Sequence, residues 1–314
     1  MKVLVTGGAG FIASNLVDNL ISQGHDVVII DNLTTGKEEN INSKATFYKE
    51  DIGNTEGLEK IFAEEKPDIV NHHAAQVDLR RSVGDPLYDA QVNIIGSLNL
   101  INISSEHNVK RFIYASTGGA VYGEPEYLPV DEKHIVDPQS QYGVSKHTVE
   151  HYLFVFRQTR NLSYTVLRYP NVYGPRQDPH GEAGVVAIFT EQMLDGKQST
   201  VFGDGTKTRD YVYVGDLVSA NMSAMFNETD MSGEIYNLGW GKEIKDIEVF
   251  EAVRDALGLS VEPLFDEKRP GEIDRICLTN TKAAKGLDWS PQVEFQEGIR
   301  LTTEFYKERR TQLS

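Results

Sequence analysis

Hydrophobic residues in the first half of the chain are gathered into short runs rich in valine, isoleucine and aromatic residues. Successive runs are separated by stretches long enough for a helix, which is the pattern of buried parallel strands joined by crossover helices. The pattern therefore predicts an α/β fold of the Rossmann type, with a doubly wound parallel sheet. The predicted strands are residues 3–5, 27–30, 69–70, 112–114 and 164–167.

After residue 170 the pattern loosens into segments rich in Gly, Pro and Asp. We expect a smaller α/β lobe here, packed on the edge of the sheet, with the ligand site in the cleft between the lobes. The cofactor domain is predicted to span 1–170 and a returning segment of about 210–240, and the substrate lobe about 171–209 and 241–314. Predicted helices lie near 184–195, 215–226, 246–257 and 294–308, and short strands near 200–202 and 235–238.

Composition narrows the class of protein. A chain of 314 residues with 39% hydrophobic content can bury one large core or two packed lobes. The formal net charge of −16 argues against binding to nucleic-acid phosphates, and the single cysteine, Cys277, excludes an intrachain disulfide. The apolar N-terminal run is interpreted as a buried strand and no run is long enough to span a membrane, so we expect a cytoplasmic protein without a metal.

The segment TGGAGFIASNL, residues 6–16, follows the first predicted strand and opens a helix. Glycines such as Gly7 and Gly10 let the backbone approach a pyrophosphate, whose charge is held at the helix N-terminus. The second strand ends in VVIID, which places Asp31 about 20 residues further on, where an acid binds the adenosine ribose. Asp31 also repels a 2′-phosphate, so the motif predicts NAD rather than NADP.

The segment QYGVSKHTVE, residues 141–150, places Tyr142 and Lys146 four residues apart, on one face of a helix. A free tyrosine has a pKa of about 10 and is a poor base. A neighbouring ammonium and an oxidised nicotinamide would stabilise its phenolate. Downstream of the dinucleotide motif, the pair is a candidate general base and its partner.

The segment ASTGGAVYG, residues 115–123, ends the fourth strand in two hydroxyls and two glycines. Counting back 25 residues from Tyr142 places the catalytic hydroxyl on Thr117, but counting back from Tyr122 and Gly123 places it on Gly118. We expect Thr117 to share a proton with Tyr142, and Ser116 is the alternative. Both hydroxyls could instead only cap the end of the strand.

With these motifs the chain resembles the extended short-chain dehydrogenase/reductases, and within them the UDP-sugar 4-epimerases, the UDP-glucose 4-epimerase family above all. The resemblance covers essentially the whole chain. Further segments that carry it are DNLTTG from Asp31, HHAAQVDLRRSV from His72, LRYPNVYGPRQ from Leu167, TRDYVYVGDL from Thr208 and RPGEI from Arg269.

The resemblance implies roles for individual residues, with NAD as the cofactor and a UDP-sugar as the substrate. The catalytic residues would be Tyr142, Lys146 and Thr117. The cofactor-binding residues would be Gly7, Gly10, Phe11, Ile12, Asp31, Asn32, Asp51, Ile52, Ala74, Asn93, Ser116, Tyr142, Lys146 and Tyr169. The UDP moiety would be held by Asn171, Arg209, Arg269 and Glu272, with Val201 either beside the uracil or in the core.

The glycines after Thr117 predict the type of reaction. In related dehydratases and decarboxylases an acid stands in this loop, whereas Gly118 and Gly119 occupy those places here. A hydroxyl, a tyrosine base and NAD suffice to oxidise a secondary alcohol and to reduce it again after the keto sugar has rotated. We therefore expect 4-epimerisation with retained NAD. A dehydratase or decarboxylase, a simple dehydrogenase and a non-catalytic NAD sensor are the alternatives.

The sugar and the oligomeric state are less well determined by the sequence. UDP-glucose and UDP-galactose are the expected pair. N-acetylated and uronic-acid substrates stay open, because Ile276 at the gating position is neither very small nor aromatic, and because Arg80, Arg81 and Arg176 could face a C6 carboxylate. The resemblance also implies a homodimer, formed through residues of about 88–106 and 141–158.

Overall fold

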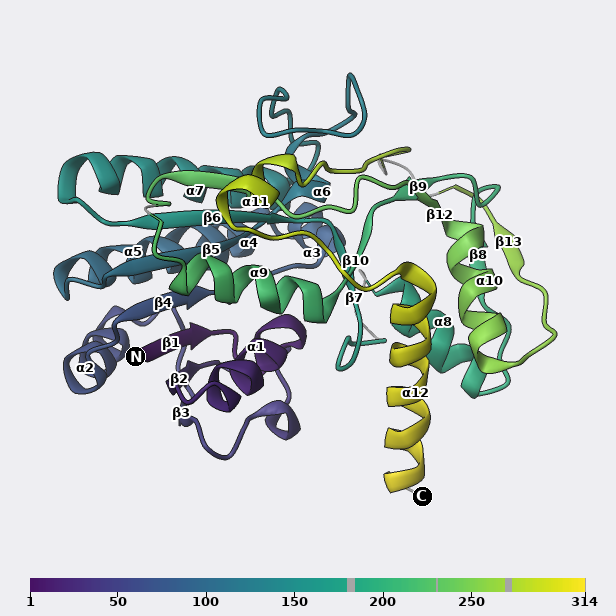
Figure 1. Ribbon diagram of the computed structural model, residues 1–314, viewed down its shortest axis with the longest axis horizontal. Coiled ribbons are helices and arrows are strands. Elements are labelled where there is room, and N and C mark those ends of the chain that lie inside the picture. Colours follow the sequence, from purple (N-terminus) through teal and green to yellow (C-terminus); the bar gives the residue numbers. More distant parts are fainter. Residues whose placement is uncertain (180–183, 230, 269–272, 314) are drawn as a thin grey trace.

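A seven-stranded parallel sheet forms the centre of the protein (Figure 1). The computed structural model describes residues 1–179, 184–229, 231–268 and 273–313. The sheet order is β11-β6-β5-β4-β1-β2-β3, and every neighbouring pair is parallel. The strands are β1 (Lys2–Thr6), β2 (Asp26–Ile30), β3 (Thr46–Tyr48), β4 (Ile69–His72), β5 (Arg111–Thr117), β6 (Tyr164–Tyr169) and β11 (Glu234–Asn237).

The order confirms the predicted doubly wound fold and all five predicted strands of the first half. The predicted short strand near 235–238 is β11, which returns to the edge of the same sheet beside β6. Strand β3 was missed, because its three residues are half-buried or exposed and so lack a hydrophobic run.

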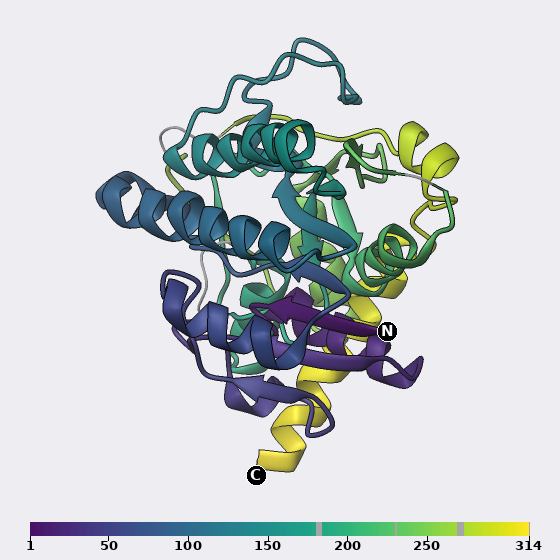
Figure 2. The same ribbon diagram turned by 90° about the vertical axis from the view of Figure 1, so that its left-hand side faces the viewer.

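Helices cover both faces of the sheet (Figures 1 and 2). Alternate residues of a strand point to opposite faces, so Val3 and Val5 of β1 join one core and Leu4 joins the other. The first core lies against α1 (Phe11–Ser22) and α9 (Val214–Phe226). The second lies against α2 (Thr55–Glu65), α5 (Ser97–Glu106) and α7 (Gln141–Arg160).

Shorter helices connect the strands near the carboxyl edge of the sheet. The 3₁₀-helix η1 (Glu38–Asn40) precedes β3. Between β4 and α5 lie α3 (Leu79–Gly84), α4 (Pro86–Ala90) and the π-helical η2 (Gln91–Gly96), and β5 runs directly into α6 (Gly118–Val121). In the described part of the chain, no helix is long and apolar enough to cross a membrane.

A second group of elements has its own core, built around Val249, Phe250 and Phe189 (Figure 1, right). The helices predicted near 184–195, 246–257 and 294–308 are present here as α8 (Val185–Leu194), α10 (Asp246–Leu257) and α12 (Phe295–Leu313), the last of which ends five residues later than expected. Helix α11 (Thr281–Gly286) was not predicted, and it packs against β11 and the first core. Three two-stranded sheets complete this region: β7 (Asn171–Tyr173) with β10 (Tyr211–Tyr213), β8 (Thr200–Phe202) with β13 (Leu264–Asp266), and β9 (Thr208–Arg209) with β12 (Ile244–Lys245).

The topology places the candidate site residues at one edge of the sheet. The chain leaves β1 toward β2 and β3 on one side, and returns to build β4, β5 and β6 on the other, so the winding reverses between β1 and β4. Ligands of such sheets bind at this point, outside the carboxyl ends of the strands. Gly7, His73 and Thr117 lie at or directly after the carboxyl ends of β1, β4 and β5.

We predict that Gly7→Ala destabilises the protein more than Gly24→Ala does. Both glycines have a positive φ, +70° and +80°, so alanine at either site incurs left-handed backbone strain of about 1–2 kcal/mol. A Cβ at Gly24 meets nothing within 4 Å, whereas a Cβ at Gly7 would stand 2.8 Å from the backbone nitrogen of Ala74. Urea unfolding of both variants measures the difference, and equal losses would show that the turn can move away from β4.

Candidate active site

Tyr142 and Lys146 lie one turn apart near the start of α7. The helix begins there because Ser140 is an N-cap, its side-chain oxygen accepting a hydrogen bond from the Gly143 backbone nitrogen at 3.1 Å. Lys146 is buried, and its Nζ lies 4.4 Å from the centre of the Tyr114 ring. The structure therefore holds both side chains beside the end of β5, where the sequence predicts the reaction.

The two hydroxyls at the end of β5 have different partners. The Thr117 side chain is hydrogen-bonded to that of Tyr142. The Ser116 hydroxyl instead donates to Glu150 Oε1 at 2.6 Å and is buried. At Gly118 any side chain would collide with Leu278. The geometry thus agrees with the count back from Tyr142, which places the catalytic hydroxyl on Thr117. Ser116 was expected near the cofactor, but its hydroxyl is hydrogen-bonded to the buried Glu150.

Burial is the main influence on the charge of the pair. Burial and the nearby carboxylate of Asp89 raise the pKa of Tyr142 to about 12, although the Thr117 hydrogen bond acts to lower it. Burial also lowers the pKa of Lys146 to about 7, although the negative charges of Glu150 and Asp89 act to raise it. The sequence predicted that Lys146 activates the tyrosine. In the structure the group that lowers the pKa of Tyr142 is Thr117.

The glycine-rich turn and Asp31 fit a dinucleotide. Gly10 directly precedes α1, with Phe11 and Ile12 in its first turn. The carboxylate of Asp31 accepts hydrogen bonds from the backbone nitrogens of Ala9, at 3.0 Å, and Leu33, at 2.8 Å. These bonds use part of its acceptor capacity and leave lone pairs for the two hydroxyls of a ribose. The residues present thus fit NAD.

Three residues predicted to bind the cofactor, two of them at the adenine, lie together at the ends of β2 and β3. The Asn32 side chain donates to Asp51 Oδ2 at 2.6 Å, and Asp51 Oδ1 accepts from the Gly53 nitrogen at 2.7 Å. Ile52 is buried against Gly96 of η2. The structure brings these side chains close to Asp31, as the sequence expects of an adenosine site.

The residues predicted along the rest of the cofactor hold the loop after β4. Ala74 donates its backbone nitrogen to Thr6 Oγ1 at 3.1 Å. The Asn93 amide accepts from the Gln76 nitrogen at 2.8 Å and donates to the Gln76 oxygen at 2.9 Å, so it pins this loop to η2. Tyr169, at the end of β6, is buried.

The predicted UDP residues are spread over the second group of elements. Asn171 lies in β7, close to Gly119, and Arg209 lies in β9, where its guanidinium donates to the Thr208 oxygen at 2.8 Å. Val201 is buried in the apolar core with Phe250. Arg269 and Glu272 lie outside the described residues.

The side chains considered for sugar selection are mostly engaged elsewhere. Arg176 pairs with Asp18 of α1 at 2.6 Å, and the Arg81 guanidinium lies 3.8 Å from the centre of the Tyr88 ring. Ile276 is buried in a small apolar cluster with Tyr122 and Leu278.

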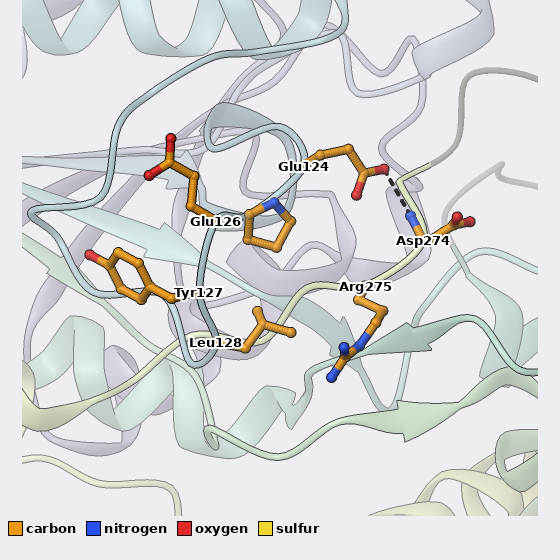
Figure 3. Close-up of a pocket in the computed structure, with 7 residues that line it drawn as sticks. Glu124, Glu126, Tyr127, Leu128, Asp274 and Arg275 are labelled. Carbon is orange, nitrogen blue, oxygen red and sulfur yellow. Dashed lines mark hydrogen bonds between the residues drawn. The ribbon is translucent and has the colours of Figure 1, made fainter.

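A surface depression lies beside this region (Figure 3). The Glu124 carboxylate accepts a hydrogen bond from the Asp274 nitrogen at 3.0 Å across it. Tyr142, Lys146 and Thr117 are not among its lining residues in the described chain, so it is separate from the candidate catalytic group. The lining residues are Glu124, Pro125, Glu126, Tyr127, Leu128, Asp274 and Arg275.

Sequence reasoning missed a buried ion pair next to the site. Arg168 of β6 donates to both oxygens of Glu150 on α7, at 3.0 and 2.5 Å, and both side chains are 3% exposed. Burial acts to raise the pKa of Glu150, but hydrogen bonds from His147, Arg168 and Ser116 and the charge of Arg168 lower it to about 2. A signal was available, because an arginine inside a run of strand residues requires a buried partner.

The fold, the glycine-rich turn and the Tyr142–Lys146–Thr117 group together define a dinucleotide-binding protein of the short-chain dehydrogenase/reductase type. The model of the NAD dependent epimerase/dehydratase family matches residues 3–239. A putative UDP-glucose 4-epimerase of Methanocaldococcus jannaschii is 45% identical over 305 residues, covering 97% of this chain and 98% of that protein. The UDP-glucose 4-epimerase of Mycolicibacterium smegmatis is 43% identical over 314 residues, covering 98% and 99%.

Solved structures agree with these relatives. The crystal structure of UDP-glucose 4-epimerase with UDP-glucose from Thermotoga maritima superposes with a TM-score of 0.96 at 47% identity, covering 99% of this chain and 100% of that one. The chain belongs to the NAD-dependent epimerase/dehydratase family and, within it, to the UDP-glucose 4-epimerase family. The predictions of the family, of NAD as cofactor and of an NAD-dependent epimerase are confirmed.

We predict that Glu150→Gln lowers the free energy of unfolding by about 3–5 kcal/mol at pH 7, because it leaves the buried Arg168 charge without its partner. Glu297→Gln is the matched control. Glu297 also takes two hydrogen bonds from an arginine, Arg300, but on the surface of α12, and we expect no measurable loss there. Urea unfolding measures both.

The same variant has a defined pH dependence. The folded pKa of Glu150 lies below its ordinary value of 4.5, so the ion pair contributes fully above about pH 4.5 and its contribution is lost as the pH falls toward about 2. The difference in the free energy of unfolding between the wild type and Glu150→Gln should therefore become smaller as the pH falls through this range. A difference that does not change with pH would show that the loss of stability comes from packing and not from charge.

Proposed function

We propose that the protein interconverts UDP-glucose and UDP-galactose by transient oxidation at C4 of the hexose. The observation that carries this proposal is the hydrogen bond between Thr117 and Tyr142 beside Lys146, with glycines where an additional acid would stand. NAD, when bound, would supply the acceptor for the C4 hydride and the donor for its return. The names of the relatives at 43–45% identity support the same reaction.

Tyr142 takes the proton of the 4-hydroxyl, and Thr117 shares that proton through its hydrogen bond. Lys146 binds the nicotinamide ribose and adds positive charge near the phenolate. For the keto sugar to present its other face, the hexose must turn while the nucleotide stays fixed. The binding energy must therefore lie mainly on the UDP moiety, for which Asn171, Arg209, Arg269 and Glu272 are the proposed ligands. Val201 is buried in the apolar core with Phe250.

Glucose and galactose are favoured over a uronic acid because two of the candidate cations have other partners. Arg176 is paired with Asp18, and Arg81 lies over Tyr88. N-acetylated sugars remain the second candidate, since Ile276 is buried with Leu278 and would not by itself fill the space beside C2 as an aromatic residue would.

The division into lobes and the location belong to the same proposal. Residues 1–170 and about 210–240 form the cofactor domain, and about 171–209 and 241–314 the substrate lobe. The two apolar cores, one around β1 and one around Phe250, support this division, and Ala283, Leu287 and Trp289 of the second segment pack on the first core. A cytoplasmic location is supported by the buried, free thiol of Cys277.

We also propose a homodimer through α7 and the segment before α5. These elements carry several exposed apolar side chains, and an exposed apolar patch of this kind is unusual on a monomer. Helices α4 and η2 pack against α7, so these side chains lie on neighbouring elements. The apolar patch consists of Leu87, which is 82% exposed, and the exposed residues Ile95, Val144, Tyr152 and Val155.

Proton NMR of the anomeric signals tests the reaction. We expect the purified enzyme to convert UDP-galactose into its 4-epimer without added NAD, and UDP-N-acetylgalactosamine and UDP-galacturonate more slowly. Build-up of NADH with no epimer would contradict the proposal and indicate a dehydrogenase. Loss of water or carbon dioxide would indicate a dehydratase or decarboxylase.

Variants of the catalytic group serve as the controls of this assay. Tyr142→Phe should lower kcat by about 10²–10⁴-fold. Thr117→Ala should lower kcat by about 10- to 100-fold, because this is the rate change that corresponds to losing one hydrogen bond to a charged group in the transition state. Ser116→Ala should change kcat much less and act on stability, because the Ser116 hydroxyl bonds to Glu150. If Ser116→Ala lowered kcat more than Thr117→Ala does, the catalytic hydroxyl would be that of Ser116.

Light scattering after size-exclusion chromatography tests the dimer. The wild type should have twice the chain mass of 35.1 kDa. Val144→Glu with Val155→Glu should give a monomer, because charges would then lie in the apolar patch. Phe265→Glu, at an exposed apolar residue of β13, is the control and should remain dimeric. A wild type of 35 kDa alone would overturn the proposal.

A further inference from the structure

A line of hydrogen bonds leads from α9 to the loop after β4. The side chain of Asn221, on α9, donates from Nδ2 to the hydroxyl oxygen of Tyr169 at 2.7 Å. The same hydroxyl lies 3.0 Å from Nε2 of His73, the residue that follows β4. Asn221 and Tyr169 are buried. The catalytic reaction proposed above uses neither of these two contacts.

The direction of these bonds determines the tautomer of His73. Nδ2 of Asn221 also donates to the Leu217 backbone oxygen at 2.8 Å, and because a carbonyl only accepts, the orientation of the amide is fixed. The Tyr169 oxygen is therefore an acceptor toward Asn221, and its one proton is directed to His73 Nε2. Burial and the charge of Lys146 lower the pKa of His73 to about 3, so the ring is neutral and carries its proton on Nδ1.

This Nδ1–H group is buried and has no hydrogen-bond partner among the described residues. Buried donors in proteins are nearly always paired, so such a group requires an acceptor from outside the chain. His73 lies at the dinucleotide turn. Its backbone nitrogen donates to Thr6 Oγ1 at 3.2 Å, and the next residue, Ala74, is the one that a side chain at Gly7 would meet.

We propose that Nδ1–H of His73 donates a hydrogen bond to the bound NAD, and that Tyr169 and Asn221 are positioning residues that hold His73 in the required tautomer. NAD offers phosphate, ribose and carboxamide oxygens as acceptors. The side chain of His73 thereby adds to the backbone contacts of the turn and helps to retain the cofactor through the catalytic cycle.

The test measures NAD binding to cofactor-stripped protein without any UDP-sugar, so its result does not depend on the proposed reaction. Calorimetry gives the affinity, and thermal unfolding with and without NAD gives the shift in Tm for each variant against its own cofactor-free form. The variants are His73→Phe, which keeps a ring but has no donor, and His73→Asn, whose amide nitrogen can take the place of Nδ1. His25→Phe, at a ring stacked on Phe226, is the control.

We expect His73→Phe to weaken NAD binding about tenfold and to reduce the NAD-induced rise in Tm. His73→Asn should restore part of the affinity, and His25→Phe should leave it unchanged. The proposal is overturned if His73→Phe binds NAD within twofold of the wild type. It is also overturned if His73→Asn loses as much affinity as His73→Phe, since the ring and not the donor would then be needed.

Discussion

Burying Glu150 and Arg168 together removes two charges from water, a cost that is offset only when both groups are fully hydrogen-bonded. Here Arg168 of β6 donates to both carboxylate oxygens and to the Tyr122 hydroxyl, and Ser116 of β5 donates to Glu150. The pair thus fixes α7 against the two strands that end in Thr117 and Tyr169. Because Glu150 stands one turn after Lys146, the positions of the catalytic side chains follow from this ionic contact.

The ion pair also acts on the chemistry of the site. Its carboxylate raises the pKa of Lys146, which burial has lowered to about 7, and so favours the ammonium form. Asp89 does the same for Lys146 but raises the pKa of Tyr142. Only the Thr117 hydrogen bond acts on the tyrosine in the direction that the base needs. The protein therefore keeps the Tyr142 phenol protonated near pH 7 and leaves Lys146 partly in its ammonium form, and positive charge from a bound oxidised nicotinamide would favour the phenolate.

The sequence could predict what depends on local pattern. Hydrophobic runs located six of the seven strands of the central sheet, and the four-residue spacing identified Tyr142 and Lys146. Counting along the chain could not choose between Thr117 and Gly118, because that choice depends on Leu278, 160 residues away. The Glu150–Arg168 pair and the His73–Tyr169 contact were missed for the same reason. Their partners meet only when the sheet is assembled. The only local indications of these contacts were Arg168 inside a strand and His73 directly after the end of β4.

The glycines that follow Thr117 owe their presence to different causes. A side chain at Gly118 would collide with the side chain of Leu278, so an acid at that position would require Leu278 to shift within its buried apolar cluster. At Gly119 a Cβ would have room, the nearest atom being the Asn171 amide oxygen at 3.8 Å. An acid there would fit sterically and would stand beside Asn171, a residue proposed to hold the UDP moiety. Its absence is therefore a matter of chemistry rather than of space, which is what a reaction needing only a base, a shared hydroxyl and a hydride acceptor requires.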